Sequence, residues 1–199
     1  IAVDEQAGGA GGSVEDLCAM VEEAAWALVP GPVATSAMAT LVIADNAVLE
    51  ALSSGELTAG VALGGDLWES SGRVSGSAGY VLGADGSGLL LLPVDDHVVL
   101  IDSRDPAVTV EPMTATDFSR PLAQVTLQDA PATRLAVTRR RFEDLMVTVL
   151  AAEAAGVARW ALETAAAYAK VREQFGKPIG SFQAVKHLCA EMLLRSQQI

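Results

Sequence analysis

The chain has 199 residues, of which 51% are hydrophobic and 19% are charged, and its formal net charge is −12. This composition excludes an intrinsically disordered chain, which would have fewer apolar residues and more charge, and it argues against binding to nucleic acids or to anionic membranes. Two cysteines, Cys18 and Cys189, are too few for a disulfide framework.

No apolar run reaches the roughly 20 residues that a membrane-spanning helix needs; Gly88 to Pro93, for example, has only the length of a strand. The N-terminus lacks the basic and apolar segments of a signal peptide, so we expect a cytoplasmic protein. The chain does not begin with Met, and the helical pattern from Glu191 to Ile199 contains no Gly or Pro stop signal. We therefore expect these residues to be part of a longer polypeptide.

Residues 1–55 are expected to form an N-terminal helical domain that is only partly present here. Ser13 follows a glycine-rich turn and is a typical N-cap, with Glu15 and Asp16 in the first turn of the helix. Apolar residues recur at helical spacing as far as Leu28, and Pro30-Gly31-Pro32 ends that helix. One or two further helices are expected between residues 34 and 52.

Residues 56–131 are expected to form a central antiparallel β-domain. Short strand-like runs, such as residues 80–82, 89–92, 98–101, 108–110 and 123–127, alternate with Gly, Asp, Ser and Pro turns. Residues 66–69 are predicted to be a solvated turn, and His97 a surface side chain at the start of a strand.

Residues 132–199 are expected to form part of a C-terminal helical bundle. A long Ala-rich helix is predicted from Phe142 to about Val171, followed by a loop over residues 172–180 and a last helix that Ser181 caps and that begins at Phe182. Helices, then strands, then helices indicate an α+β fold with segregated domains.

Several kinds of chemistry have no support in the sequence. The glycines at residues 8–12 lack the Lys-Ser/Thr of a phosphate-binding loop and the spacing of a dinucleotide fingerprint. No Gly-x-Ser-x-Gly elbow is present. Two histidines, His97 and His187, and two cysteines are scattered without metal-ligand spacing, so we predict no metal site and assign no catalytic residue.

The loop between the two predicted C-terminal helices has the residue types that a diphosphate-bearing ligand needs. Arg172 offers a planar fork for phosphate oxygens, Gln174 an amide for phosphate or ribose, and Phe175 a ring that packs on a flat surface. The alternative is an ordinary interhelical loop in which Arg172 pairs with Glu173 or another acid.

The run from Arg172 to Met192, with Gln174-Phe175-Gly176-Lys177-Pro178-Ile179 and Phe182-Gln183-Ala184-Val185-Lys186-His187 at its centre, resembles the C-terminal signature of the acyl-CoA dehydrogenase family. Softer likenesses cover most of the remaining chain, including the glycine turn into Ser13, Leu28 to Pro32, and the pairs Arg120-Pro121 and Ala130-Pro131. The resemblance implies N-terminal helices, a central β-domain and a C-terminal four-helix bundle. It also implies FAD-dependent removal of two hydrogens from an acyl-CoA substrate.

The resemblance implies that Arg172, Gln174 and Phe175 contact the diphosphate and adenosine part of an FAD bound mainly by a neighbouring subunit. Ile179, Phe182 and Gln183 are weaker candidates near the same group. The carboxylate base of the family is expected beyond Ile199, so no base is assigned.

Two departures from the family pattern concern the flavin ring. Gly64-Gly65-Asp66-Leu67 stands where the family has a Thr-Glu-Pro-x-x-Gly-Ser-Asp-like loop, and Tyr80-Val81-Leu82 replaces a Trp-x-Thr/Ser contact. The lost hydroxyl donors would each contribute about 1 kcal/mol. The pattern resembles the degenerate partner subunit of heteromeric actinobacterial acyl-CoA dehydrogenases of the steroid side-chain type. A self-sufficient homo-oligomeric enzyme and a structural partner that binds no flavin are the alternatives.

Overall fold

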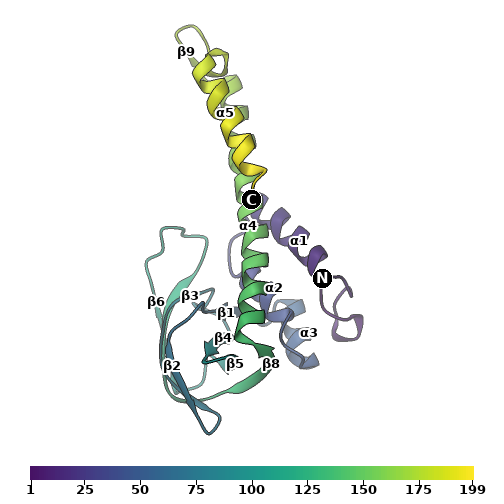
Figure 1. Ribbon diagram of the computed structural model, residues 1–199, viewed down its shortest axis with the longest axis vertical. Coiled ribbons are helices and arrows are strands. Elements are labelled where there is room, and N and C mark those ends of the chain that lie inside the picture. Colours follow the sequence, from purple (N-terminus) through teal and green to yellow (C-terminus); the bar gives the residue numbers. More distant parts are fainter.

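The computed structural model describes residues 1–199 as a curled β-sheet, three short helices beside it, and a long helical hairpin that projects away from both (Figure 1). The hairpin consists of α4 (Arg139–Val171) and α5 (Gln183–Ser196), and its connecting loop lies at the end farthest from the sheet. The expected α+β architecture, with strands between two sets of helices, is confirmed.

The N-terminal helices begin where the sequence predicts. A short 3₁₀ turn, η1 (Glu5–Ala7), precedes α1 (Val14–Trp26), whose N-cap Ser13 forms a reciprocal capping box with Asp16. The chain then forms two helices, α2 (Val33–Thr40) and α3 (Asn46–Ser54), and Asp45 caps the second by accepting hydrogen bonds from two backbone amides. These caps satisfy amide groups that the first turn of a helix leaves without partners.

The main sheet has the strand order β6-β7-β3-β1-β4-β5-β8, with β2 paired to β3. Its strands are β1 (Ala59–Val61), β2 (Asp66–Ser70), β3 (Arg73–Leu82), β4 (Leu89–Val94), β5 (His97–Asp102), β6 (Val108–Pro112), β7 (Leu122–Pro131) and β8 (Thr133–Thr138). All pairs are antiparallel except β1 with β4, which run parallel. The sheet is therefore mixed rather than wholly antiparallel.

The apolar run in β4 has a simple explanation in the packing. Leu89 and Leu91 belong to a cluster that the sheet forms with the helices, whereas Leu90 and Leu92 belong to a second cluster inside the curled sheet. Successive strand residues point to opposite faces. Both faces of β4 are buried, so apolar residues are needed at every position.

Three features of the sheet differ from the sequence expectations. Residues 66–69 form strand β2 rather than a turn, because they pair along β3. The sheet also continues through β8 to Thr138, beyond the interval 56–131. His97 is only 6% exposed, and its Nε2 lies 2.7 Å from Glu69 Oε2, so it is a buried, paired side chain and not a surface one.

Helix α4 is anchored to the molecule along its first half. A Cβ at Gly156 would lie 2.1 Å from the carbonyl oxygen of Glu22, which shows how closely α4 and α1 cross there. Helix α4 is long and apolar enough to cross a membrane by length and composition, but this is weak evidence, since core helices pass the same test. Beyond the crossing, several of its apolar side chains are exposed, among them Tyr168 and Val171.

Candidate cofactor-binding site

The loop that follows α4 is a built structure rather than an irregular connection. Glu173–Gln174 (β9) and Lys177–Pro178 (β10) pair antiparallel, and Gln174 stands opposite Lys177. Phe175 and Gly176 form the two-residue turn, and both have positive φ angles, +56° and +75°. Positive φ at both central positions defines the type I′ hairpin, so the tip has one preferred shape.

Phe175 is an unusual residue for this turn. A side chain larger than that of Asn or Gly is rarely found in left-handed conformation, which costs about 1–2 kcal/mol for an L-residue. The ring is 91% exposed, so burial within this chain does not compensate for the strain. Its one aromatic contact is an edge-to-face arrangement with Phe182, with ring centroids 6.0 Å apart. Strain of this kind concentrates at binding and catalytic sites.

Arg172 is fixed through its backbone and free at its guanidinium. Its amide donates to the carbonyl of Tyr168 at 2.9 Å, and its own carbonyl accepts from the amide of Ile179 at 2.8 Å. The side chain is exposed and forms none of the ion pairs of the molecule. The pair with Glu173, which an ordinary interhelical loop would favour, is therefore absent.

The other three predicted contact residues, Ile179, Phe182 and Gln183, follow the hairpin directly and differ in their burial and contacts. Ile179 opens the 3₁₀ turn η2 (Ile179–Ser181) and is half-buried. Phe182 is the N-cap of α5, which corrects the expectation that Ser181 caps this helix, because Ser181 ends the 3₁₀ turn. The Gln183 amide lies 3.3 Å from His187 Nε2 and is thus partly committed within the chain.

Lys177 belongs to the same tip, although the sequence analysis did not single it out. Its ammonium nitrogen lies 4.6 Å from the centroid of the Phe182 ring, a cation–π contact. The sequence feature that could have identified Lys177 is its position in Gly176-Lys177-Pro178, directly after Phe175. Arg172 and Lys177 place two cations on one small hairpin of a chain whose net charge is −12. The tip is therefore suited to an anionic ligand that carries a flat ring.

The part of the sheet where the resemblance places the flavin ring differs from the hairpin tip in its packing and its exposure. Gly65 is packed closely against β3, since a Cβ there would lie 2.7 Å from the carbonyl oxygen of Ser77. Tyr80 points out of an irregular part of β3 and is 68% exposed with a φ of +56°. Leu82, at the end of the same strand, lines a cavity between the sheet and the helices.

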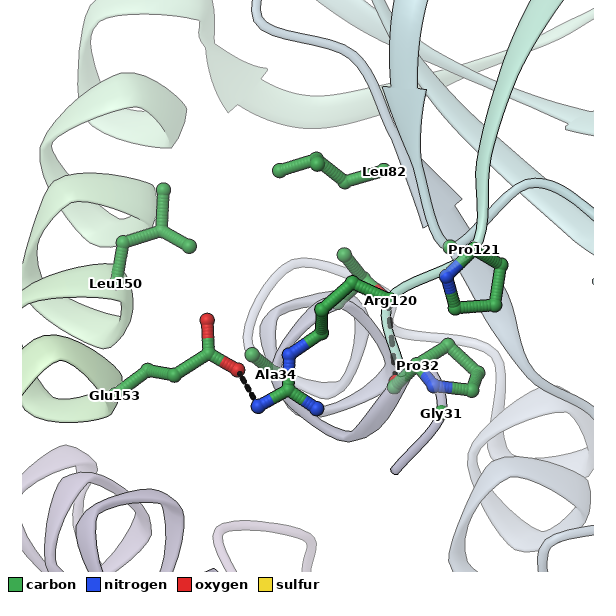
Figure 2. A pocket seen from close by; sticks show the side chains of 10 residues that line it. Gly31, Pro32, Ala34, Leu82, Arg120, Pro121, Leu150 and Glu153 are labelled. Carbon is green, nitrogen blue, oxygen red and sulfur yellow. Dashed lines mark hydrogen bonds and ion pairs between the residues drawn. The ribbon is translucent and has the colours of Figure 1, made fainter. Parts of the chain in front are cut away.

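This cavity has a volume of about 70 Å³ and lies between α2, α4 and the loop before β7 (Figure 2). Arg120 extends toward α4, where its Nη2 lies 2.9 Å from Glu153 Oε1, and its Nη1 donates to the carbonyl of Val29 at 2.9 Å. The loop that carries Arg120 is itself ordered, because the Ser119 hydroxyl donates to Asp117 at 2.7 Å, and this hydrogen bond lowers the pKa of Asp117. Pockets that hold cofactors typically enclose about 300–1,000 Å³. The cavity does not fit a flavin ring.

The residues of this chain thus fit one part of FAD and not the other. The hairpin tip has cations, an amide and an exposed ring for a diphosphate and an adenosine. The sheet side has a small cavity, and the hydroxyl that lines it, on Thr35, already donates to Pro32. Glu153 lines the cavity and Glu173 belongs to the hairpin, but neither is assigned as a catalytic base, and the position of the base stays a prediction.

Comparison with known proteins supports the same family. The family described as acyl-CoA dehydrogenase, C-terminal domain, matches residues 137–199. The chain is 62% identical over its whole length to the acyl-CoA dehydrogenase FadE34 of Mycobacterium tuberculosis, and covers 28% of that protein. It is 32% identical over 96% of its length to the acyl-CoA dehydrogenase IpdE2 of the same organism, and covers 56% of it. The chain thus spans only part of the relatives that it matches.

Solved structures agree with the fold. A variant of the Tcur3481-Tcur3483 steroid ACAD superposes with a TM-score of 0.86 at 27% identity, over 99% of this chain and 61% of that one. The FAD complex of PigA superposes with a TM-score of 0.78 at 22% identity, over 99% and 63% of the two chains. At that identity the PigA likeness speaks for the fold alone. Sequence signature, relatives and architecture converge, and the chain belongs to the acyl-CoA dehydrogenase family.

Proposed function

We propose that this chain is a subunit of an FAD-dependent acyl-CoA dehydrogenase and that it lends the tip of its α4–α5 hairpin to a flavin held mainly by a neighbouring subunit. The observation that carries the proposal is the tip itself. It combines a free guanidinium on Arg172, the amide of Gln174 and the strained, exposed ring of Phe175 on a preformed hairpin.

The distance between the tip and the sheet supports a contact across a subunit interface. Glu153, beside the cavity, and Arg172 are separated by 19 residues of one helix, which is about 30 Å at 1.5 Å per residue. The tip and the cavity at Leu82 are therefore parts of different sites. In this proposal Arg172 and Lys177 neutralise the diphosphate, Gln174 binds a phosphate or ribose oxygen, and Phe175 covers the adenine.

FAD, when bound, supplies the acceptor for the two hydrogens that leave Cα and Cβ of an acyl-CoA thioester. The role of this chain is to bind and orient the cofactor from its adenosine side. The neighbouring subunit supplies the catalytic base and the ring contacts that Leu82 does not offer. The similarity to the Tcur3481-Tcur3483 steroid ACAD favours a steroid side-chain CoA as substrate. We place the assembly in the cytoplasm.

The experiment is purification of the full-length protein, alone and together with a second acyl-CoA dehydrogenase subunit, with flavin absorbance and native mass read on the same fractions. A yellow hetero-oligomer and a colourless protein alone are expected. A yellow homo-oligomer would instead favour a self-sufficient enzyme, and a colourless hetero-oligomer a purely structural partner.

Arg172→Ala tests the tip directly in the purified assembly. Loss of one charge-assisted contact to a phosphate, worth about 1.5–3 kcal/mol, is expected to weaken FAD retention by roughly 10- to 150-fold. Arg195→Ala is the matched control, because Arg195 is an exposed arginine of α5 that pairs with Glu191 within its own helix. Unchanged flavin retention in Arg172→Ala would contradict the cross-subunit role.

A further inference from the structure

By the family resemblance, Leu82 stands at the position of a flavin-ring contact, and it lines the cavity between the sheet and the helices. Its polar lining groups already have partners within the chain. The hydroxyl of Thr35 donates to the carbonyl of Pro32 at 3.1 Å, and the amide of Gly83 donates to the carbonyl of Pro121 at 2.7 Å. Ligand pockets orient their ligands through a few free polar groups, whereas the Thr35 hydroxyl and the Gly83 amide already donate within the chain.

Arg120 and Glu153 form the wall of the cavity. Both residues, together with Leu150, also line an open groove along α4 on the outer side. Their side chains are 25% and 21% exposed, so the ion pair is half-buried and lies where the cavity meets the groove. Figure 2 shows the two side chains meeting between the helix and the loop before β7.

The same pair connects three parts of the molecule. Arg120 belongs to the loop between β6 and β7, Glu153 to α4, and the carbonyl that accepts from Arg120 belongs to Val29, between α1 and α2. The amide of Gly31 adds a second link by donating to the carbonyl of Ser119 at 2.9 Å. These contacts hold the sheet and the helices together across the space that a ligand would occupy.

We infer that Arg120 and Glu153 close this chain's own flavin-ring position, so that the cavity is a structural joint between sheet and helices and not a site for flavin or acyl group. The inference rests on the proposed function, in which this chain holds FAD only at the hairpin tip. Charged groups of opposite sign at 2.9 Å form a neutral pair, which offers no net charge to an anionic ligand.

Filling the cavity tests this inference. Ala34 is 6% exposed and lines the cavity from α2. In the purified assembly, Ala34→Leu and the milder Ala34→Val place additional carbon atoms in the space. Bound FAD per assembly and turnover per bound FAD are expected to stay within twofold of the unmodified protein, with an equal or higher Tm. A loss of FAD or turnover of fivefold or more, at unchanged Tm, would show that the cavity holds a ligand and would overturn the inference.

Glu153→Gln provides a second test should both Ala34 variants fail to fold, because it keeps the shape of the side chain and removes its charge. A decrease in Tm of roughly 2–4 °C is expected for a domain of this size, again with unchanged FAD content. Loss of FAD at an unchanged Tm would contradict a structural role for the pair.

Comparison with Arg172→Ala separates this inference from the proposed function. Loss of FAD in Arg172→Ala alone supports both. Loss of FAD in both Arg172→Ala and the Ala34 variants supports the role of the tip and overturns the inference that the cavity holds no ligand. Retention of FAD in all these variants overturns the role of the tip but agrees with a cavity that holds no ligand. Loss of FAD in the Ala34 variants alone overturns both proposals.

Discussion

Phe175→Gly should separate the binding role of the hairpin tip from its contribution to stability. Glycine adopts positive φ without steric cost, so the change removes about 1–2 kcal/mol of left-handed strain. It also removes the edge-to-face contact with Phe182, worth about 0.5–1.5 kcal/mol. The 91% exposed ring loses almost no buried area. The two effects largely offset each other, so the free energy of unfolding is expected to change by no more than about 1.5 kcal/mol in either direction.

The effect of Phe175→Gly on cofactor retention should be much larger. Stacking of an aromatic side chain on a nucleic acid base is worth about 1–3 kcal/mol. If Phe175 covers the adenine of FAD, the variant should release FAD roughly 5- to 150-fold more readily. Cofactor affinity then falls while stability changes little, which a purely structural role of Phe175 does not predict.

A second turn in the molecule provides a matched control. Ser71 and Gly72 connect β2 and β3 as a two-residue turn with φ angles of +53° and +75°, the same geometry as Phe175-Gly176. Ser71→Gly removes comparable backbone strain far from the helical hairpin. Its Tm should be equal to or higher than that of the unmodified protein, and its FAD retention unchanged.

The assay is dilution of the purified assembly, followed by flavin fluorescence as FAD is released, with Tm measured on the same samples. Two results would refute the reasoning. A fall in Tm of more than about 5 °C would mean that the Phe175 ring is a structural element of the tip. Equal FAD release from Phe175→Gly and Ser71→Gly would mean that the ring does not contact the cofactor.

Two further predictions concern the scaffold. In Gly156→Ala, overpacking of about 1–3 kcal/mol or more outweighs the gain in helix propensity of about 1 kcal/mol, because the new Cβ meets the backbone of Glu22 at 2.1 Å. Thermal unfolding should show a lower Tm. An unchanged or higher Tm would contradict the close α1–α4 crossing. The hydrogen bond from Arg104 lowers the pKa of Asp102 below its ordinary value of 3.8, so this stabilisation is present above that pH and lost as pH falls below it; acid unfolding of Arg104→Ala should show a smaller loss of stability below about pH 4 than the unmodified protein.

Features determined by neighbouring residues were predictable from the sequence. The cap at Ser13 and the break at Pro30-Gly31-Pro32 depend on residues within one helical turn, and the structure places α1 and α2 accordingly. The α4 helix was predicted from its period, although it begins at Arg139 rather than Phe142. Local rules also identified the loop over residues 172–180, because its cation, amide and ring are adjacent in the chain.

Features that depend on tertiary contacts were not predictable in this way. His97 follows two aspartates and has the sequence context of a surface residue, yet the pairing of β2 brings Glu69 to within 2.7 Å of its ring. The β9–β10 hairpin was missed for the opposite reason, since Phe at a position that requires positive φ is contrary to the usual turn residues. In both cases the local pattern is overruled by pairing between strands.

The closed cavity adds a physical reason for the division of labour that the family resemblance implies. Leu82 alone indicates one missing hydrogen bond, which weakens flavin binding by about 1 kcal/mol and would leave the site usable. The ion pair between Arg120 and Glu153, 33 residues apart in the sequence, adds a second obstacle, since its side chains line the cavity and link the loop before β7 to α4. Reopening the site would leave one of these charges buried without a partner, at a cost of about 3–5 kcal/mol when burial is complete. A closed ring position in this chain is the arrangement that the proposed function requires, in which the neighbouring subunit keeps the open ring position.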